Sequence, residues 1–468
     1  MASLKPTLAT VLILVQVCPT AVFAQATTST SPTKASPSER VVTLNAEQAA
    51  TIAVRVSPSV RFAAASKEQA DDAADTSAAL FAPELDLMGS YTRLSPVKYP
   101  PFEFGGQSME NPFPVILNNY LLRATVTLPV TDYFLKILPT YQAVDLNADV
   151  SEHQQRTEVE RIALRAREAF YNYVKAEASI KVAQDSVKHL EDYVKDLDAL
   201  FEAGNVTRAD AMQAQAQLAN AQAQLAVAVG TLQVTKDTLR RLLYLPPDAK
   251  IHITEDIFAV SSAPPPANQK ALLAEALRDR PEIKALRTLG RVRDATIDSE
   301  QARRLPNVSV VGNLDYANPN ARYIPITDEF KTTWDISAVL RWSPNDFVLG
   351  KIDVEKAELE LKRARTDLRL LQDQIVVEAS QASSEYHAAE SAVQSAKVGV
   401  QAAEEAWRVR RDLFRAGEAT SNEVLESEIA LRRAQRLQID ANVGLSLARA
   451  RLQHLVGKAA PAAKAPRS

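Results

Sequence analysis

The chain has 468 residues, and its 54 lysines and arginines nearly balance its 57 aspartates and glutamates, giving a formal net charge of −3. This balance excludes the strongly basic surface of a nucleic-acid-binding protein, so we expect no nucleic-acid partner. Only 12 glycines are present, and alanine and glutamine are abundant, which favours long helices over a fold with many tight turns.

Residues 1–24 have the pattern of an export signal peptide. Lys5 provides the positive start, residues 8–17 are mostly apolar, and Ala24 is a small residue at the expected cleavage point. The only cysteine, Cys18, would be removed with this segment, so the mature chain would have neither a disulfide nor a thiolate metal site. Lipidation of Cys18 is the alternative. No later apolar stretch reaches about 20 residues, so we expect no transmembrane helix.

Three further segments have the composition of connectors. Residues 25–42 are largely rich in Ser, Thr and Pro, residues 246–268 contain three consecutive prolines, and residues 458–468 are rich in Ala, Pro and Lys. We expect the first to be disordered, the second to link two halves of the chain, and the third to be a flexible tail.

Two strands are predicted near residues 83–92 and 119–130, because apolar and polar residues alternate in both. One face of each strand is therefore formed by apolar or small residues, which are Leu85, Leu87, Gly89 and Tyr91 in the first strand and Tyr120, Leu122, Ala124, Val126 and Leu128 in the second.

Two helices are predicted next, over residues 140–201 and 207–244, with a glycine turn at Gly204 between them. The second helix has Ala or Gln at most positions from Ala209 to Val229. These small side chains would let neighbouring helices approach closely.

The second half of the chain repeats this order after a helix predicted from about Gln269 to Arg303. The predicted elements that follow are strands near 306–316 and 333–342 and helices over 351–414 and 420–456. In the second of these strands, Trp334 and Trp342 bound an apolar face. Eight residue steps of about 3.3 Å span roughly 26 Å, close to the apolar band of an outer-membrane barrel.

The helix predicted over 351–414 carries a coiled-coil seam. Apolar or small residues recur along it at alternating steps of three and four, and Arg410 is the one interruption.

The two halves also repeat each other residue by residue. Leu200-Phe201-Glu202-Ala203-Gly204-Asn205-Val206-Thr207 returns as Leu413-Phe414-Arg415-Ala416-Gly417-Glu418-Ala419-Thr420, and at the same offset Asp210 meets Glu423. Matched glycine turns, prolines and strands indicate an internal duplication of residues 43–245 and 269–457.

Four strands cannot close a barrel around a lumen, and open sheet edges are not tolerated in lipid. If these strands span a membrane, at least two chains must contribute, and three chains would supply twelve strands. A soluble, half-buried sheet would show the same alternation and stays open as an alternative. The export signal, the duplication and the paired tryptophans favour a membrane, whose interface would be met by Tyr91, Tyr120, Tyr316, Trp334 and Trp342.

Taken together, these features resemble the TolC family of outer-membrane efflux and secretion channels, from about residue 43 to residue 457. The resemblance rests on the duplicated order of two strands and a long helix, on the strand opening Pro306-Asn307-Val308-Ser309-Val310, and on the two glycine turns. It implies an α+β membrane protein with internal structural duplication. A long α-helical coiled-coil barrel would join a trimeric, twelve-stranded transmembrane β-barrel to which each chain contributes four β-strands.

The resemblance further implies the partners and the location of the chain. A homotrimer would sit in the bacterial outer membrane, in contact with its lipid, and extend its helical tunnel into the periplasm. It would be the passive exit duct of a tripartite efflux or type I secretion system, docked onto a periplasmic adaptor and supplied by an inner-membrane pump. The hairpin tips that would meet the adaptor contain Phe201, Ala203, Gly204, Phe414, Ala416 and Gly417.

The resemblance also implies a constriction at the periplasmic mouth. In the family, carboxylates just after the second hairpin turn line this mouth, and Glu423 and Glu426 stand at those positions. Their spacing places them on one helix face, and three copies would form a ring that attracts cations. Asp210, the counterpart of Glu423 in the first half, could bond across the tip. A locking arginine and a tyrosine of some members are replaced by Ala419 and Phe414, so a closing network of that kind is not expected.

The sequence contains no motif for catalysis. Its five histidines are scattered without metal-ligand spacing, and no phosphate loop, nucleophile elbow or HExxH is present. We therefore expect neither an enzyme nor a bound cofactor or metal. Two other functions stay open. A periplasmic adaptor would normally have one hairpin flanked by β-rich domains, and a structural coiled-coil protein without a pore would have no use for a strand bounded by tryptophans.

Overall fold

A computed structural model describes residues 41–97, 102–104, 107–109, 115–258 and 268–459. The predicted signal peptide, Cys18, and most of the predicted disordered segment and tail lie outside these residues. Helices make up most of the described chain, and among its helices none is long and apolar enough to cross a membrane.

The first half contains two short helices, the first strands of a sheet and a long helical hairpin. In chain order its elements are β1 (Val41–Leu44), α1 (Ala46–Val56), α2 (Pro58–Ala79), β2 (Glu84–Arg93), β3 (Phe102–Phe104), β4 (Gln107–Met109), β5 (Asn118–Leu128), α3 (Val130–Asp132), the π-helical turn η1 (Tyr133–Ile137), α4 (Leu138–Glu202), α5 (Arg208–Leu242) and β6 (Lys250–Ile253).

The second half follows the same order of helices, strands and hairpin. Its elements are α6 (Gln269–Asp279), α7 (Pro281–Ala302), β7 (Asn307–Asn318), β8 (Lys331–Arg341), α8 (Pro344–Arg415) and α9 (Ser421–Leu455). This repetition of elements agrees with the duplication expected from the sequence.

Proline positions several helix starts. The first residue of α2, α7 and α8 is a proline, where its missing amide hydrogen leaves no bond unmade. The prediction of a single helix from Gln269 to Arg303 is wrong, because the residue before a proline disfavours the helical conformation. Arg280 has an extended backbone (ψ 129°) before Pro281, and the chain breaks there into α6 and α7.

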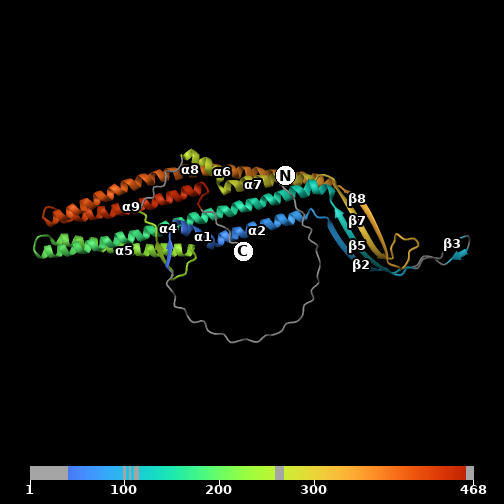
Figure 1. Cartoon of the computed structure of the whole chain (residues 1–468), viewed down its shortest axis with the longest axis horizontal. Coiled ribbons are helices and arrows are strands. Elements are labelled where there is room, and N and C mark those ends of the chain that lie inside the picture. Colours follow the sequence, from blue (N-terminus) through green and yellow to red (C-terminus); the bar gives the residue numbers. More distant parts are fainter. Residues whose placement is uncertain (1–40, 98–101, 105–106, 110–114, 259–267, 460–468) are drawn as a thin grey trace, which may run out of the picture. The chain divides into compact units, whose positions relative to one another are not determined.

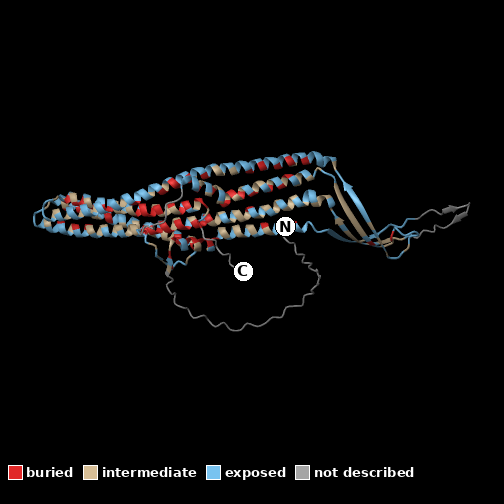
Figure 2. Cartoon of the chain, turned by 45° about the horizontal axis from the view of Figure 1, so that its top comes forward, coloured by how far each residue is buried: buried red, intermediate tan, exposed pale blue. Residues whose placement is uncertain are grey.

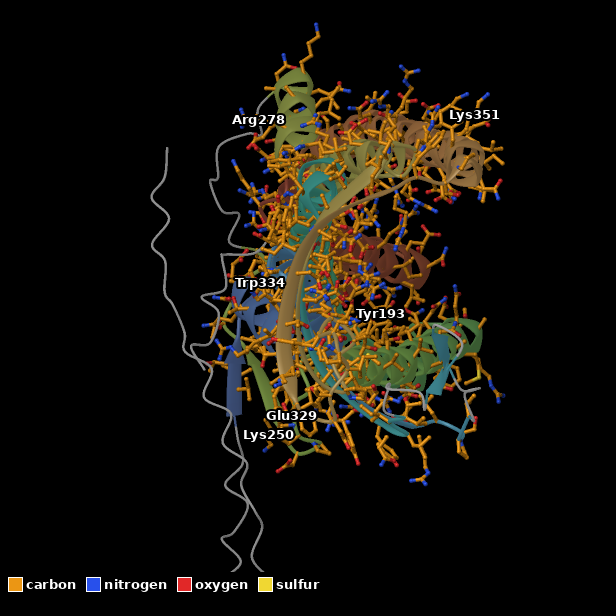
Figure 3. The ribbon with its side chains drawn as sticks, turned by 90° about the vertical axis from the view of Figure 1, so that its right-hand side faces the viewer. Tyr193, Lys250, Arg278, Glu329, Trp334 and Lys351 are labelled. Carbon is orange, nitrogen blue, oxygen red and sulfur yellow. The ribbon has the colours of Figure 1, made fainter. Side chains whose placement is uncertain are left out.

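The four long strands form one antiparallel sheet in the order β2-β5-β7-β8, so that the two halves meet where β5 pairs with β7. The register brings the predicted apolar faces together: Leu122 lies opposite Tyr316, and Leu314 opposite Trp334. The resulting apolar face is exposed, with Leu87 at 75% and Ile336 at 70%. The end-on view shows the curved strands, with Trp334 along β8 (Figure 3).

The opposite face of the sheet is polar and internally bonded. Arg123 donates two hydrogen bonds to Asp315, at 2.6 and 2.9 Å. Asn313 accepts from Thr125 at 2.9 Å and donates to Asp335 at 3.0 Å. One face of the sheet therefore suits lipid and the other suits water.

The helices of each hairpin lie side by side, α4 against α5 and α8 against α9 (Figure 1). The hairpin tips and the sheet lie at opposite ends of the long helices α4 and α8. α4 also packs against α2, α7 and α9, so it connects the two hairpins. Buried residues gather where α4 and α9 are flanked on several sides, whereas most of α5 is exposed (Figure 2).

All three predicted connectors contain ordered residues. Within the predicted linker 246–268, β6 pairs in parallel with β1, so residues 41–42 belong to a strand rather than to a disordered segment. At the other end, Ala459 is fully buried and donates its amide hydrogen to Glu160 at 2.7 Å. Composition predicted neither contact, because each partner lies far away in the sequence.

Candidate functional site

The two hairpin tips have the same backbone geometry. Gly204 and Gly417 adopt φ values of 77° and 79°, which L side chains rarely take. Each turn closes by two hydrogen bonds to the end of the preceding helix, a Schellman motif; in the second, Gly417 donates to Phe414 and Glu418 to Leu413. The predicted tip residues Ala203 and Ala416 are the C-caps of α4 and α8.

Each tip then starts its descending helix with a capping box. Thr207 accepts a hydrogen bond from the amide of Asp210, whose carboxylate accepts from the amide of Thr207. Thr420 and Glu423 exchange the same pair of bonds at the start of α9. In this structure, Asp210 and Glu423 therefore each help to cap the N-terminus of a helix.

The predicted constriction carboxylates differ in their surroundings. Glu426 is exposed and accepts a hydrogen bond from Asn422 at 3.1 Å. Glu423 pairs with Arg410 at 3.0 Å, and the Thr420 amide, followed by the charge of Arg410, holds the pKa of Glu423 below its usual value. Asp210 bonds to Thr207 of its own hairpin rather than across the tip. Arg410, the residue that interrupts the seam of α8, is thus a partner of the predicted ring.

An open hollow of about 1000 Å³ separates the two tips. Beside this hollow, polar contacts that were not predicted from the sequence join the two hairpins. Tyr193 of α4 donates to Ser421 of α9, whose carbonyl oxygen lies at 3.2 Å and whose hydroxyl lies at 3.1 Å. Gln213 of α5 donates to Asn422 of α9 at 3.0 Å. These bonds hold the two tips together within one chain.

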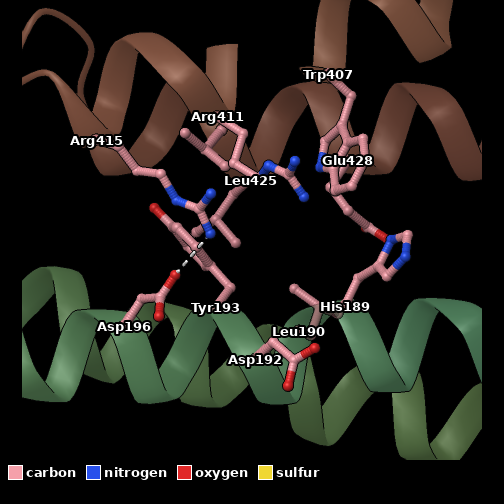
Figure 4. Close-up of a pocket in the computed structure, with 11 residues that line it drawn as sticks. His189, Leu190, Asp192, Tyr193, Asp196, Trp407, Arg411, Arg415, Leu425 and Glu428 are labelled. Atoms are coloured by element: carbon pink, nitrogen blue, oxygen red, sulfur yellow. Dashed lines mark hydrogen bonds and ion pairs between the residues drawn. The ribbon is translucent and has the colours of Figure 1, made fainter. Parts of the chain in front are cut away.

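A ring contact and an ion pair add to these contacts between the two hairpins near the tips. The predicted tip residue Phe414 packs edge-on against Tyr193, with ring centroids 5.6 Å apart. Phe201, its counterpart in the first hairpin, is 44% exposed. Arg415 of α8 faces Asp196 of α4 at 3.5 Å (Figure 4). The two tips therefore differ in packing although their turns are alike.

Farther from the tips, α9 carries a buried ion pair that α4 completes. Arg432 and Glu428 are each 5% exposed and lie 2.6 Å apart. Glu428 also accepts a hydrogen bond from Ser186 at 3.0 Å, and Arg432 contacts Nδ1 of His189 at 2.6 Å. We call Ser186, His189, Glu428 and Arg432 the interlock. Because a buried charge needs a partner and satisfied hydrogen bonds, these contacts tie α4 to α9.

The interlock borders a small cavity of about 110 Å³ between α4 and the second hairpin (Figure 4). Trp407 of α8 stacks on His189 with ring centroids 4.8 Å apart and an angle of 5° between the rings. The guanidinium of Arg411 lies 4.7 Å from the centre of the Trp407 ring. α8, α9 and α4 thus meet in a single layer.

The predicted interface aromatics are exposed on the apolar face of the sheet. Trp334 and Trp342 are 69% and 53% exposed. Tyr91 and Tyr120 pair at 5.0 Å, and Tyr316 stacks on Phe330 at 4.9 Å. Phe330 was not predicted, although it lies just before the strand and an aromatic residue at that position was a usable signal.

No metal site is evident in the part of the chain that the structure describes: no group of three or more His, Cys, Asp or Glu residues converges there. The polar groups that do converge form pairs and caps within and between helices. Their arrangement suits a structural contact that joins the two hairpins.

Two helical hairpins related by duplication, continued by a sheet with one lipid-compatible face, define the class of outer-membrane export channels. A family model described as "Outer membrane efflux protein" matches residues 52–243 and 272–458, and the chain belongs to this family. It is therefore an outer-membrane efflux channel protein. The family and its structural neighbours are channels rather than enzymes. Among curated proteins, no significant match was found.

Solved structures support the same architecture. The chain is similar to VceC from Vibrio cholerae, with a TM-score of 0.71 and 19% identity over 88% of this chain and 96% of that one. For CmeC from Campylobacter jejuni the TM-score is 0.71, the identity 15% and the coverage 90% and 87%. For the open state of MtrE from Neisseria gonorrhoeae these values are 0.71, 16%, and 88% of each chain. At such identities the likeness shows the fold.

Proposed function

We propose that the chain works as a homotrimer in which each copy contributes β2, β5, β7 and β8 to a twelve-stranded transmembrane β-barrel. The observation that carries this proposal is the sheet with an exposed apolar face and a hydrogen-bonded polar face. Among the described strands, β2 and β8 are the two ends of this sheet, and open edges are not tolerated in lipid. Pairing β8 of one copy with β2 of the next would remove every edge.

The hairpins of the three copies would form the wall of a passive duct. Its helices offer no motif for nucleotide hydrolysis, so the energy for transport would come from an inner-membrane pump. The exposed tips, including Phe201 and the turns at Gly204 and Gly417, are the surfaces that a periplasmic adaptor would contact. The complex would serve tripartite efflux or type I secretion.

Glu423 and Glu426 would set the ion preference at the mouth of this duct. Both lie on the first turns of α9, and Glu426 is exposed. In a trimer six carboxylates would gather around one axis, although Arg410 offsets part of the charge of Glu423. A ring of carboxylates favours cations.

The test is the reversal potential of single channels in a salt gradient. We expect the variant Glu423→Gln, Glu426→Gln to lose part of its cation preference without losing conductance. The control is Glu355→Gln, Glu358→Gln, a pair with the same spacing on an exposed face of α8 far from the tip. An unchanged reversal potential in the tip variant would remove these residues from the constriction.

A further inference from the structure

The interlock contains one titratable group whose hydrogen-bond polarity is fixed by its partner. Arginine has only donors, so the 2.6 Å contact between Nη2 of Arg432 and Nδ1 of His189 requires Nδ1 to accept. His189 must then be neutral, with its proton on Nε2. A proton on Nδ1 would place two donors and two positive charges against each other.

We propose that His189 is a proton-sensitive contact between the two hairpins: neutral His189 holds α4 against α8 and α9, and its protonation releases them so that the tips separate. The proposal builds on the proposed function, because the tips are the mouth of the duct only if the chain forms one. It adds a condition under which that mouth loosens.

The groups that face His189 from each packed element support this reading. α9 contributes one acid and one base that already pair with each other, so neither is free to balance a new charge. α8 contributes the ring of Trp407 and the cation of Arg411. On α4 itself, Asp185 is exposed. Protonation therefore adds a charge that the buried part of the layer does not compensate; the charged and aromatic groups around His189 are Asp185, Trp407, Arg411, Glu428 and Arg432.

The direction of the pH effect follows from the same geometry. Burial, and then the nearby charge of Arg432, lower the pKa of His189 below its ordinary value, which is about 6.5. Separated hairpins would hydrate His189 and restore the ordinary pKa, so the separated state binds a proton more readily. The contact is therefore fully stable above about pH 6.5 and weakens as pH falls from there toward the lowered pKa.

Two other histidines have lowered pKa values but occupy different places. His153 lies on α4, where burial and then Arg156 lower its pKa. His454 lies near the end of α9, where burial and then Arg280 lower its pKa. For neither histidine does the structure record a hydrogen bond between the two hairpins near the tips, so both serve to separate the role of His189 from general histidine titration.

The experiment measures the separation of the tips in the detergent-extracted full chain. Spin labels on cysteines introduced at Asn205 and Glu418, one on each tip, report the distance between the hairpins from pH 7.5 to pH 5. We expect the distances in the parent chain to increase on acidification. His189→Asn, whose amide oxygen can accept in place of Nδ1 but cannot titrate, should stay closed at both pH values. His189→Lys, which keeps a positive charge, should be open already at pH 7.5.

Controls and a second readout keep the outcomes distinct. His387→Gln, a change at a side chain that is 64% exposed, should leave the pH response unchanged. A pH-independent parent chain, or a pH response that persists in His189→Asn and disappears in His153→Gln or His454→Gln, would overturn the proposal. Single-channel conductance of the same samples tests the duct itself, so a conducting but pH-insensitive channel refutes the interlock alone.

Discussion

The two hairpins of this chain share one backbone design but differ in how they use it. Both turn at a glycine with positive φ and restart at a threonine with a capping box. Yet α9 buries 15 of its 35 residues, including an ion pair, whereas α5 buries four, three of them alanines. At the positions that match Glu428 and Arg432, the first hairpin has Gln215 and Ala219.

The contacts between the hairpins pair residues that differ between the two copies of the repeat. Arg410, Arg415 and Trp407 of the second hairpin match Leu197, Glu202 and Val194 of the first, so these three side chains are present in one copy of the repeat only. Arg415 and Trp407 meet Asp196 and His189 of α4, whereas Arg410 pairs with Glu423 within its own hairpin. The exposed, alanine-rich side of α5 leaves a surface on which another helix can pack closely. The two hairpins therefore share a backbone, and the contacts between them depend on side chains that differ between the two copies.

The largest effect is expected from breaking the interlock. Glu428→Ala leaves Arg432 buried without its carboxylate, which should lower the free energy of unfolding by about 3–5 kcal/mol. Denaturant unfolding of the extracted protein measures it. Converting both positions to the residues of the first hairpin, Glu428→Gln with Arg432→Ala, should cost less than the single change. Equal losses would mean that the pair is solvated.

The tip turns should respond alike in both hairpins. Gly204→Ala and Gly417→Ala each force a side chain into a left-handed conformation, at a cost of about 1–2 kcal/mol. Gly230→Ala, in α5 with open space around the added methyl group, should instead stabilise by about 0.5–1 kcal/mol. A clear difference between the two tip variants would contradict the shared backbone design.

A smaller loss is expected from Tyr193→Phe. The variant keeps the ring contact with Phe414 but loses the hydroxyl bonds to Ser421, which should cost about 1 kcal/mol. Thermal unfolding and the distance between tip labels both report it. A stability equal to that of the parent chain would show that these bonds do not hold the hairpins together.

The smallest effect is expected from Arg410→Leu, which installs the residue of the matching position in the first hairpin. Arg410 and Glu423 are 47% and 40% exposed, so solvent screens their pair and it should contribute little to stability. Its removal should act on ion preference instead, by leaving more negative charge at the mouth. A large loss of stability would show that this pair is structural.

Much of this fold could be predicted from the sequence because its signals are local. Alternation placed Leu122 and Trp334 on the correct face, and repeated glycines located both tips. The pairing of β1 with β6 and the break before Pro281 were missed, since a distant partner and the choice between a kink and a new helix leave little local trace.

The interlock was missed for a related reason. Which side of α9 meets α4 depends on the rotation of one hairpin against the other, and the sequence does not specify that rotation. Glu428 and Arg432 stand, however, within the apolar stripe that contains Leu425. Opposite charges four residues apart in such a stripe were a usable sign of a buried pair.

The most direct test of the account is the single-channel conductance of the detergent-extracted chain in a planar bilayer, measured together with its mass in detergent. We expect a trimer with discrete conductance steps, because only several copies can close the edges at β2 and β8. A monomer without conductance would contradict it and would mean that the exposed apolar face of the sheet serves another purpose.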